Sequence, residues 1–405
     1  MTTSPANLAN ARVIAPQSIE ETIWSDSQAL GSQLQMLRER LFPPSAEKEL
    51  RRFSSPEVAK LIGVTESYIR HLALAAEGPS PDKTAGGRRA YTLEHVHELR
   101  RFLGNSKPAY LPNRRSGDHL QVIAVTNFKG GSGKTTTAAH LAQYLALHGH
   151  RVLAVDLDPQ ASMSALFGYQ PEFDVGENQT LYGAICYDKP RQLSDIIRTT
   201  YFSGLDLVPG NLELHEFEHD TPRVLASREH ADDMFFLRVA EALRSVDDRY
   251  DVVVIDCPPQ LGFLTMSALC AATSVLITVH PQMLDIASMN QFLAMTSNLL
   301  SVVKEAGGNL DYDWMRYLVT RYEPNDAPQA QIVAFLRNLF GERVLTAMMV
   351  KSTAISDAGL SKQTIYEATK DSMHRQTYER ALESMDSVNS EIEQLVLKAW
   401  GRATE

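Results

Sequence analysis

The sequence predicts an α/β fold in which helices cover both faces of a mostly parallel sheet, and two observations support this prediction. The first is a series of short apolar runs bounded by turn residues, with helical stretches between most of them. Apolar strands that alternate with helices form parallel sheets buried on both faces. The second is a glycine-rich loop that follows the first run and precedes a helical stretch, as in phosphate-binding α/β domains. The runs are Gln121–Thr126, Val152–Asp156, Leu205–Pro209, Val252–Asp256, Val275–His280, Met315–Thr320 and Val344–Val350.

Length and composition are typical of a soluble protein with two or three domains. The chain has 405 residues, of which 44% are hydrophobic and 22% charged. The three cysteines form no close pair, which indicates a reducing compartment rather than disulfides or a zinc site. No apolar run follows a basic N-terminal stretch, and none reaches the roughly 20 residues that span a bilayer. We therefore expect a cytoplasmic protein with no membrane partner.

Charge is distributed unevenly along the chain. The net charge is −10, which argues against a protein that coats DNA with its whole surface. Residues 47–116 carry 13 Lys and Arg against 8 Asp and Glu, a balance of +5, so the rest of the chain carries −15. A basic module on an acidic body indicates that only one part contacts nucleic acid.

Residues 1–46 are predicted to contain a polar tail and one amphipathic helix. Apolar residues recur at spacings of seven, four, three and four, which is the pattern of one helix face. Pro43–Pro44 ends the pattern. This face packs either on its own chain or on a second copy in a dimer, and the pattern does not distinguish the two. The apolar residues are Ile23, Leu30, Leu34, Leu37 and Leu41.

Residues 47–104 are predicted to form a compact helical domain, and 105–117 a linker. Ser54–Glu57 is typical of a helix start, and Gly63 supplies a turn to a second short helix capped by Thr65. Two short helices across such a turn indicate a helix-turn-helix. Gly86–Thr92 follows as a turn and short strand before a last helix. The linker contains two prolines and little apolar periodicity, and residues 118–405 form the α/β domain.

The glycine-rich loop has the composition of a phosphate-binding loop that takes MgATP. Its glycines allow backbone N–H groups to turn toward phosphate oxygens, and the following helix directs its positive end at the same charge. Lys134 would neutralise the β- and γ-phosphates, and the Thr135 hydroxyl would complete the coordination of Mg²⁺. A plain glycine-rich turn is the alternative. The nucleotide-binding residues are Gly130, Gly131, Ser132, Gly133, Lys134, Thr135 and Thr136.

The loop departs from the common form, because Phe128 stands where the first glycine belongs and Lys129 is an additional lysine. In this it resembles the deviant Walker A family of ParA-type and MinD-type ATPases. Val155–Ser162 is similar to the family's second nucleotide motif, and Tyr250–Pro259 to its Walker B strand. The resemblance covers roughly Leu120 to the C-terminus. It implies a P-loop NTPase fold and ATP hydrolysis.

The residues that match these motifs have expected roles in hydrolysis, which requires neutralised charge and an oriented water. We expect Asp158 to position that water and Asp256 to hold Mg²⁺ through its waters. Asp156 is expected to support the loop geometry. In the family, the lysine matched by Lys129 reaches across a dimer to the partner's phosphate, which makes Lys129, Lys134 and Asp158 the candidate catalytic residues. Each of these acids could instead be structural, and Lys129 a solvated charge.

Residues 53–103 resemble the winged helix-turn-helix of the larger partition ATPases, and the whole layout is closest to the RepA proteins of RepABC plasmid cassettes. That likeness includes Met349–Ser356. The second helix would face a major groove, and the wing would contact phosphates or a minor groove. Solvated charges are the alternative for each basic residue, including Lys370, Arg375 and Arg380 near the C-terminus. The candidate DNA-binding residues are Thr65, Ser67, Tyr68, Arg70, His71, Arg88, Arg89, Lys351 and Lys362.

Together these features predict a plasmid-partitioning ATPase that dimerises with ATP, binds operator and nucleoid DNA, and is stimulated by a ParB-type adaptor. It would also repress its own operon. A transcription regulator that uses the P-loop only as a nucleotide sensor is the alternative. A MinD-like membrane cycler needs a basic amphipathic C-terminal helix, whereas residues 390–405 carry three glutamates against Lys398 and Arg402. An iron–sulfur reductase needs paired cluster cysteines, and none is suitably placed.

Overall fold

The computed structural model describes residues 18–41, 48–75, 77–83, 86–227, 234–308, 310–369 and 373–402, and it divides into two compact units. The first unit, 1–48, contains helix α1 (Ile19–Leu41), as the apolar spacing predicts. Several large apolar side chains of α1 are more than half exposed within the described structure: Ile19, Ile23, Trp24, Leu30 and Met36. The side chains of Leu34, Leu37 and Leu41, and the residues Pro43–Pro44, lie outside the described part. The choice between own-chain packing and a dimer contact therefore stays open.

The second unit, 49–405, begins with three helices and a two-stranded antiparallel ribbon. Glu57 accepts a hydrogen bond from the Ser54 N–H at 2.8 Å and so caps the first helix, and Gly63 ends that helix with φ of 81°. Thr92 caps the third helix through the His95 N–H at 3.1 Å. The elements are α2 (Ser55–Ile62), α3 (Glu66–Ala75), β1 (Asp82–Lys83), β2 (Arg89–Ala90) and α4 (Leu93–Gly104).

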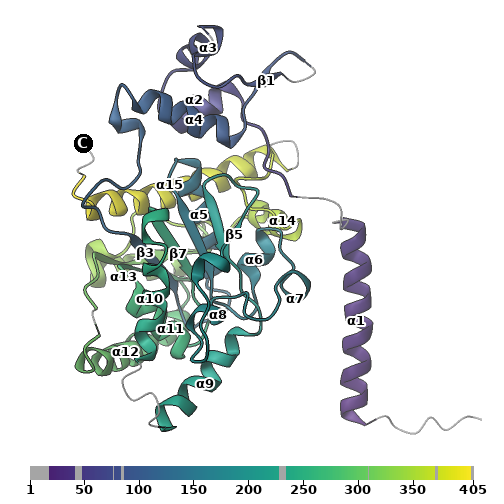
Figure 1. The fold of residues 1–405 in the computed structure, drawn as a ribbon, viewed down its shortest axis with the longest axis vertical. Coiled ribbons are helices and arrows are strands. Elements are labelled where there is room, and N and C mark those ends of the chain that lie inside the picture. Colours follow the sequence, from purple (N-terminus) through teal and green to yellow (C-terminus); the bar gives the residue numbers. More distant parts are fainter. Residues whose placement is uncertain are drawn as a thin grey trace, which may run out of the picture. The chain divides into compact units, whose positions relative to one another are not determined.

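A seven-stranded sheet in the order β5-β6-β4-β7-β3-β8-β9 forms the centre of the α/β domain (Figure 1). All neighbouring pairs are parallel except β5 with β6. Six of the seven predicted apolar runs form strands, so the predicted fold class is confirmed for this domain. The strands are β3 (Gln121–Thr126), β4 (Val152–Asp156), β5 (Arg198–Thr199), β6 (Leu205–Val208), β7 (Val252–Asp256), β8 (Ser274–Val279) and β9 (Trp314–Val319).

The predicted strand Val344–Val350 is wrong: the run forms only isolated bridges, at Val344 and Val350, beside β9. The N–H groups of Leu345 and Met349 donate to β9, to the Tyr317 and Val319 carbonyls at 2.9 Å each, but three other amide groups of the run bond elsewhere. The N–H groups of Thr346 and Ala347 donate to the Glu391 carboxylate at 2.8 and 2.7 Å. The Val350 N–H donates to the Ser384 hydroxyl at 2.9 Å. Both acceptors lie on helix α15 (Arg375–Ala399), which therefore shares the amide groups of the run with β9 and leaves no continuous ladder.

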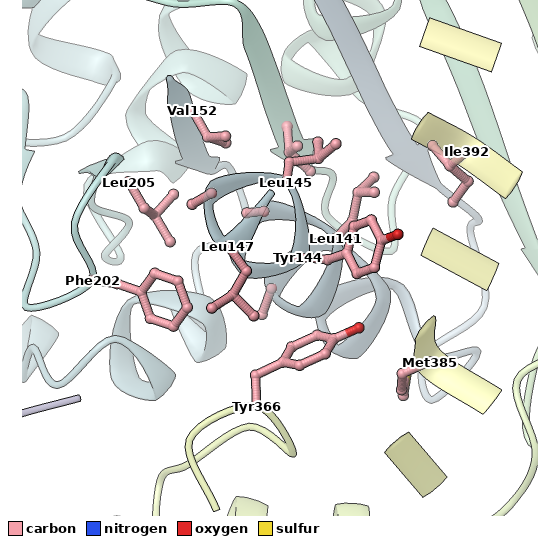
Figure 2. Packing of buried hydrophobic residues seen from close by; sticks show 14 of the residues in the cluster. Leu141, Tyr144, Leu145, Leu147, Val152, Phe202, Leu205, Tyr366, Met385 and Ile392 are labelled. Atoms are coloured by element: carbon pink, nitrogen blue, oxygen red, sulfur yellow. The ribbon is translucent and has the colours of Figure 1, made fainter. Parts of the chain in front are cut away.

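Helices cover both faces of the sheet, and successive strand residues separate into two cores. Ile123 and Val125 pack in one core with α5 (Lys134–Leu147) and α15, whereas Val122 and Ala124 pack in the other. Figure 2 shows side chains of α5 surrounded by Phe202, Tyr366, Met385 and Ile392. The second core is covered by α9 (Leu214–Ser227), α10 (Arg238–Arg244), α11 (Phe263–Ala271), α12 (Met283–Glu305) and α13 (Ala327–Phe340). The remaining α-helices are α6 (Ser162–Leu166), α7 (Pro171–Asp174), α8 (Tyr182–Ile185) and α14 (Thr353–Leu360).

The first core continues without a break from residues 53–103 into α5 and α15. Polar contacts accompany it: His97 Nε2 lies 2.8 Å from the Ala146 carbonyl at the end of α5, and Lys60 pairs with Asp386 on α15 at 3.3 Å. The helices α2 to α4 are therefore packed on the same side of the sheet as α5.

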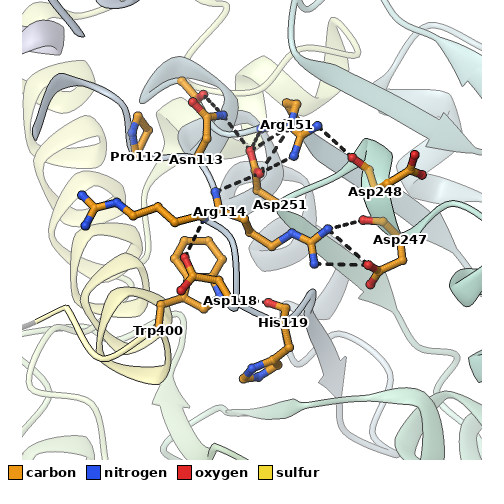
Figure 3. A network of polar contacts seen from close by, with 12 residues as sticks. Pro112, Asn113, Arg114, Asp118, His119, Arg151, Asp247, Asp248, Asp251 and Trp400 are labelled. Carbon is orange, nitrogen blue, oxygen red and sulfur yellow. Dashed lines mark hydrogen bonds and ion pairs between the residues drawn. The ribbon is translucent and has the colours of Figure 1, made fainter. Parts of the chain in front are cut away.

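The segment predicted as a linker is fixed to the α/β domain by the polar network in Figure 3. The Asp251 carboxylate accepts hydrogen bonds from Asn113 Nδ2 at 2.8 Å and from the Arg114 N–H at 3.0 Å. Arg151 donates to the same carboxylate at 2.8 Å, and the several hydrogen bonds keep the pKa of Asp251 below its ordinary value against the effect of burial. The boundaries at 104 and 118 stay predictions.

Candidate functional site

The glycine-rich loop joins the carboxyl end of β3 to the first residue of α5. Strand β3 lies between β7 and β8, so the loop is surrounded by the carboxyl ends of neighbouring parallel strands. Gly131 and Gly133 have φ angles of 75° and 87°, in the left-handed region that glycine adopts without steric cost. The backbone can therefore curl at the N-terminus of α5, where helix N–H groups favour an anion.

A cavity of about 550 Å³ opens over this loop. Its floor contains most of the predicted nucleotide-binding residues, Gly130, Gly131, Gly133, Lys134, Thr135 and Thr136. Asp158 also lines it, whereas Ser132 is buried beneath the loop. Residues that were not predicted to contact nucleotide also line the cavity, although most of them belong to the segment Met349–Ser356 noted above: Met349, Val350, Lys351, Ser352, Ile355 and Met385. The volume suits a nucleotide-sized ligand with phosphates at the loop and an apolar group at the wall.

Lys134 is buried in the floor of the cavity. Its Nζ donates to the Lys129 carbonyl at 3.3 Å, and it forms no ion pair with any described residue. Burial lowers its pKa, and the charges of Asp256 and Asp158 oppose that decrease. A bound polyphosphate would supply the missing counter-charge.

Asp256 and Asp156 end the adjacent strands β7 and β4, where they are paired in register. Both oxygens of Asp256 are buried and lack a hydrogen-bond partner of good geometry in the described part of the chain, although the Thr135 side chain is close enough to stabilise the charged carboxylate. Burial, and then the charge of Asp156, raise the pKa of Asp256 well above its ordinary value, while the Thr135 side chain opposes the increase. An unpartnered carboxylate beside the Thr135 hydroxyl fits a divalent cation with oxygen ligands.

Asp156 is satisfied by the protein itself. Its Oδ2 accepts hydrogen bonds from the Ser164 N–H at 2.8 Å and from the Ser164 hydroxyl at 2.7 Å. Burial raises its pKa to about 7. Asp158 is half-buried on the cavity wall, and its Oδ1 accepts from the Gln160 N–H at 2.9 Å. These contacts suit a structural role for Asp156 and a ligand-facing role for Asp158.

Lys129 does not extend freely into solvent. Its ammonium forms an ion pair with Asp285 in the first turn of α12, although 42% of its side chain is exposed. Asp285 also lies 3.1 Å from Nδ1 of His280. Neither Asp285 nor His280 was a candidate, because only the fold brings α12 to the loop. The sequence signal available was the position of His280 directly after an apolar strand.

The predicted DNA-binding residues gather in two places. Ser67, Tyr68, Arg70, His71 and Arg88 are exposed. Arg70 of α3 and the ribbon residues Lys83, Arg88 and Arg89 surround a groove of about 670 Å³, and Lys83 was missed at the sequence level. Lys351 instead lines the cavity over the loop and pairs with Glu323 at 2.9 Å. Lys362 has a left-handed backbone with φ of 52°, and Lys370 lies outside the described residues.

Comparisons with known proteins are consistent with this arrangement. A family model described as an AAA domain matches residues 120–306. A replication protein A of Rhizobium rhizogenes is 57% identical over 382 residues, covering 93% of this chain and 95% of the relative. SopA of Escherichia coli K12 is 30% identical over 367 residues, and the match covers 88% of this chain and 92% of SopA.

A solved structure described as a partition protein has a TM-score of 0.62 at 16% identity, and the match covers 94% of this chain and 99% of that one. At that identity the likeness concerns the fold alone. No helix in the described ranges has the length and apolar character that a membrane span requires. The chain belongs to the family of ParA-type partition ATPases, in the group of the RepA proteins of RepABC plasmid cassettes.

Proposed function

We propose that the chain is a plasmid-partitioning ATPase that binds MgATP, dimerises on ATP, binds DNA and is stimulated by a ParB-type adaptor. One observation carries the enzymatic part of the proposal. Lys134 is buried in the lining of a nucleotide-sized cavity and forms no ion pair with a described residue, and the buried Asp256 carboxylate lies near Thr135, which also lines that cavity. Two buried groups of this kind, with few hydrogen-bond or ion-pair partners, are costly unless a ligand completes them, and a metal-bound polyphosphate offers an anion to Lys134 and a cation to Asp256.

The residues of the cavity have distinct tasks in hydrolysis. The loop N–H groups and Lys134 would bind the phosphates, while Thr135 and Asp256 would hold Mg²⁺, which supplies positive charge to the phosphate oxygens. Asp158 would accept a hydrogen bond from the attacking water, since its carboxylate lines the cavity and is fixed by Gln160. ATP and Mg²⁺ are thus the expected cofactors.

A homodimer through the nucleotide face is supported by exposed apolar side chains. Met283 and Leu284 are 70% and 79% exposed, and they directly precede Asp285, which holds Lys129. Large exposed apolar residues beside a functional site are typical of a protein interface. In a dimer, Lys129 would leave Asp285 and contact the nucleotide of the partner subunit.

DNA binding is proposed for the winged helix-turn-helix formed by α2, α3, β1–β2 and α4. Its basic groove combines Arg70 with Lys83, Arg88 and Arg89. Ser67 and Tyr68 are exposed on α3, which would enter a major groove. Lys351 and Lys362 are proposed contacts to non-specific nucleoid DNA. Operator binding through the winged domain would allow the protein to repress its own operon. Non-specific DNA binding would associate the protein with the nucleoid.

The test is ATP hydrolysis by the full chain, with and without DNA and adaptor. Lys134→Ala should lose MgATP binding, because the buried cradle then lacks its cation. Asp158→Ala should bind ATP but hydrolyse it about 100-fold more slowly in a single turnover, since one water-positioning group is lost. Glu172→Ala, at an exposed acid on α7, is the control and should match wild type. ATP binding without hydrolysis in the wild type would instead favour a regulator that only senses nucleotide.

A further inference from the structure

Two residues that directly follow strand β9 contact the phosphate loop, and the proposed mechanism gives them no role. The Thr320 hydroxyl is buried and donates a hydrogen bond to the Ser132 carbonyl at 2.7 Å. Arg321 Nη1 donates to the Gly131 carbonyl at 3.1 Å. Both residues also line the cavity. The two donors therefore act on consecutive carbonyl groups of the loop.

These hydrogen bonds determine where the loop's N–H groups point. In a trans peptide the C=O and the following N–H point in opposite directions. The Gly131 carbonyl shares its peptide with the Ser132 N–H, and the Ser132 carbonyl shares its peptide with the Gly133 N–H. Neither N–H donates to another group in the described part of the chain. Holding the two carbonyls thus leaves two N–H donors directed away from Thr320 and Arg321 and available to an anion.

The backbone around Arg321 is fixed from both sides. Arg321 has φ of 53°, a left-handed conformation that is uncommon for a side chain of this size. The Thr320 N–H donates to the Val279 carbonyl and the Tyr322 N–H to the Met349 carbonyl, each at 2.9 Å. Strand β8 and the cavity wall therefore support a strained residue whose side chain turns back to the loop.

The loop is also supported from β8, where the Thr278 hydroxyl donates to Ser132 Oγ at 3.0 Å. Thr320 also lies against Gly133, since a Cβ built on this glycine would be 3.4 Å from Thr320 Cβ, an ordinary van der Waals contact. Thr320 therefore packs directly on the glycine whose N–H it helps to orient.

We propose that Thr320 and Arg321 are positioning residues that set the phosphate loop in its binding conformation before nucleotide arrives. The proposal rests on the proposed nucleotide-binding function. Nucleotide then binds more tightly, because the loop is already ordered and no binding energy is needed to order it. The Tyr322 N–H also bonds to the Met349 carbonyl, so the segment that holds the loop is connected to another residue that lines the cavity.

The first test measures the affinity of the full chain for ADP and for MgATP in Thr320→Val and Thr320→Ser. Valine keeps the shape and removes the hydroxyl, which leaves the Ser132 carbonyl without its donor, so affinity should fall about tenfold or more. Serine restores the hydroxyl and should bind within about threefold of wild type. The nucleotide-free melting temperatures of both variants should stay close to wild type. Equal affinity of Thr320→Val and wild type would overturn the proposal, as would an equal loss in Thr320→Ser.

The second test compares Arg321→Ala with Arg343→Ala. Arg343 also donates to a backbone carbonyl, that of Phe340 at 3.4 Å, but it does not line the cavity. Arg321→Ala should weaken ADP binding about fivefold, and Arg343→Ala less than twofold. Equal affinities in the two variants would remove Arg321 from the proposal. If wild type itself bound neither nucleotide, the proposed function would fail rather than the positioning role.

Discussion

At the scale of single residues, the carboxylates at the ends of β4 and β7 differ in how far the protein compensates for their burial. Asp156 and Asp256 are both wholly buried and paired in register; burial raises the pKa of each, and the charge of Asp156 raises that of Asp256 further. Asp156 offsets its burial with two hydrogen bonds from Ser164, whereas Asp256 has none in the described structure. The residue least satisfied by the protein is thus the one proposed to hold Mg²⁺.

Replacement of Asp256 should make the nucleotide-free protein more stable and inactive. Because the folded-state pKa is raised, the folded protein binds more protons than the unfolded chain at intermediate pH. The free energy of unfolding therefore falls as pH rises above about 4, and for Asp156 the fall continues to about 7. Asp256→Asn should increase the free energy of unfolding by on the order of 2 kcal/mol at pH 8 and abolish Mg²⁺-dependent hydrolysis.

Urea unfolding of the nucleotide-free protein at pH 5 and pH 8 measures this effect. Asp357→Asn, at an exposed aspartate on α14, is the control and should follow wild type at both values. An Asp256→Asn variant that is no more stable than wild type at pH 8 would show that the buried carboxylate does not destabilise the folded protein. Activity in that variant would remove Asp256 from the metal site.

At the scale of elements, the ribbon β1–β2 and helix α3 form one basic surface from segments about 20 residues apart. Arg70 pairs with Glu66 one turn away on α3, and Arg52 pairs with Asp82 on the ribbon at 2.9 Å. Exposed pairs of this kind contribute little to stability. Arg70 can therefore leave Glu66 for a phosphate contact without loss of the fold.

Arg88→Ala combined with Arg89→Ala should weaken operator binding and flatten its salt dependence. Each phosphate contact that is lost should reduce the slope of log affinity against log salt by about 0.9. Basal ATP hydrolysis should not change, because neither arginine lies at the nucleotide cavity. Titration of operator DNA at several salt concentrations measures the slope, with Arg244→Ala on α10 as the matched control. The same slope in the double variant and the control would place the wing away from DNA.

At the scale of the whole molecule, helix α5 connects the two proposed binding functions. Its first residue, Lys134, lies at the phosphate loop, and its last turn contacts His97 of α4 through the Ala146 carbonyl. Helices α2 to α4 share a core with α5 and α15, so the proposed DNA-binding domain is packed on the helix that begins at the nucleotide. A change in the position of α5 would therefore act on both sites.

The assembly of two such molecules is tested by Lys129. Lys129→Ala should keep nucleotide binding by the monomer within about threefold and lose adaptor-stimulated hydrolysis, since its ammonium faces Asp285 and not its own cavity. Mixing Lys129→Ala with Asp158→Ala subunits should restore hydrolysis, because one site then combines an intact lysine and an intact aspartate from different chains. Adaptor-stimulated turnover rates of each single variant and of the mixture measure whether Lys129 acts on the partner subunit. Wild-type stimulated turnover by Lys129→Ala alone would contradict the cross-dimer role.

The α/β class, six of the strands, the phosphate loop and the acids at strand ends could be predicted from the residues alone, because each depends on local periodicity or a short motif. Other features depend on contacts between segments that are far apart in the chain. Val344–Val350 has the apolar composition of a strand, but its amide hydrogen bonds are divided between β9 and α15. Lys129 could be a solvated charge if its loop alone is considered, but the fold places Asp285 in contact with its ammonium group. Thr320 reaches Ser132 across 188 residues of chain. Such contacts arise from the order of parallel strands in the sheet, which no local pattern of residues encodes.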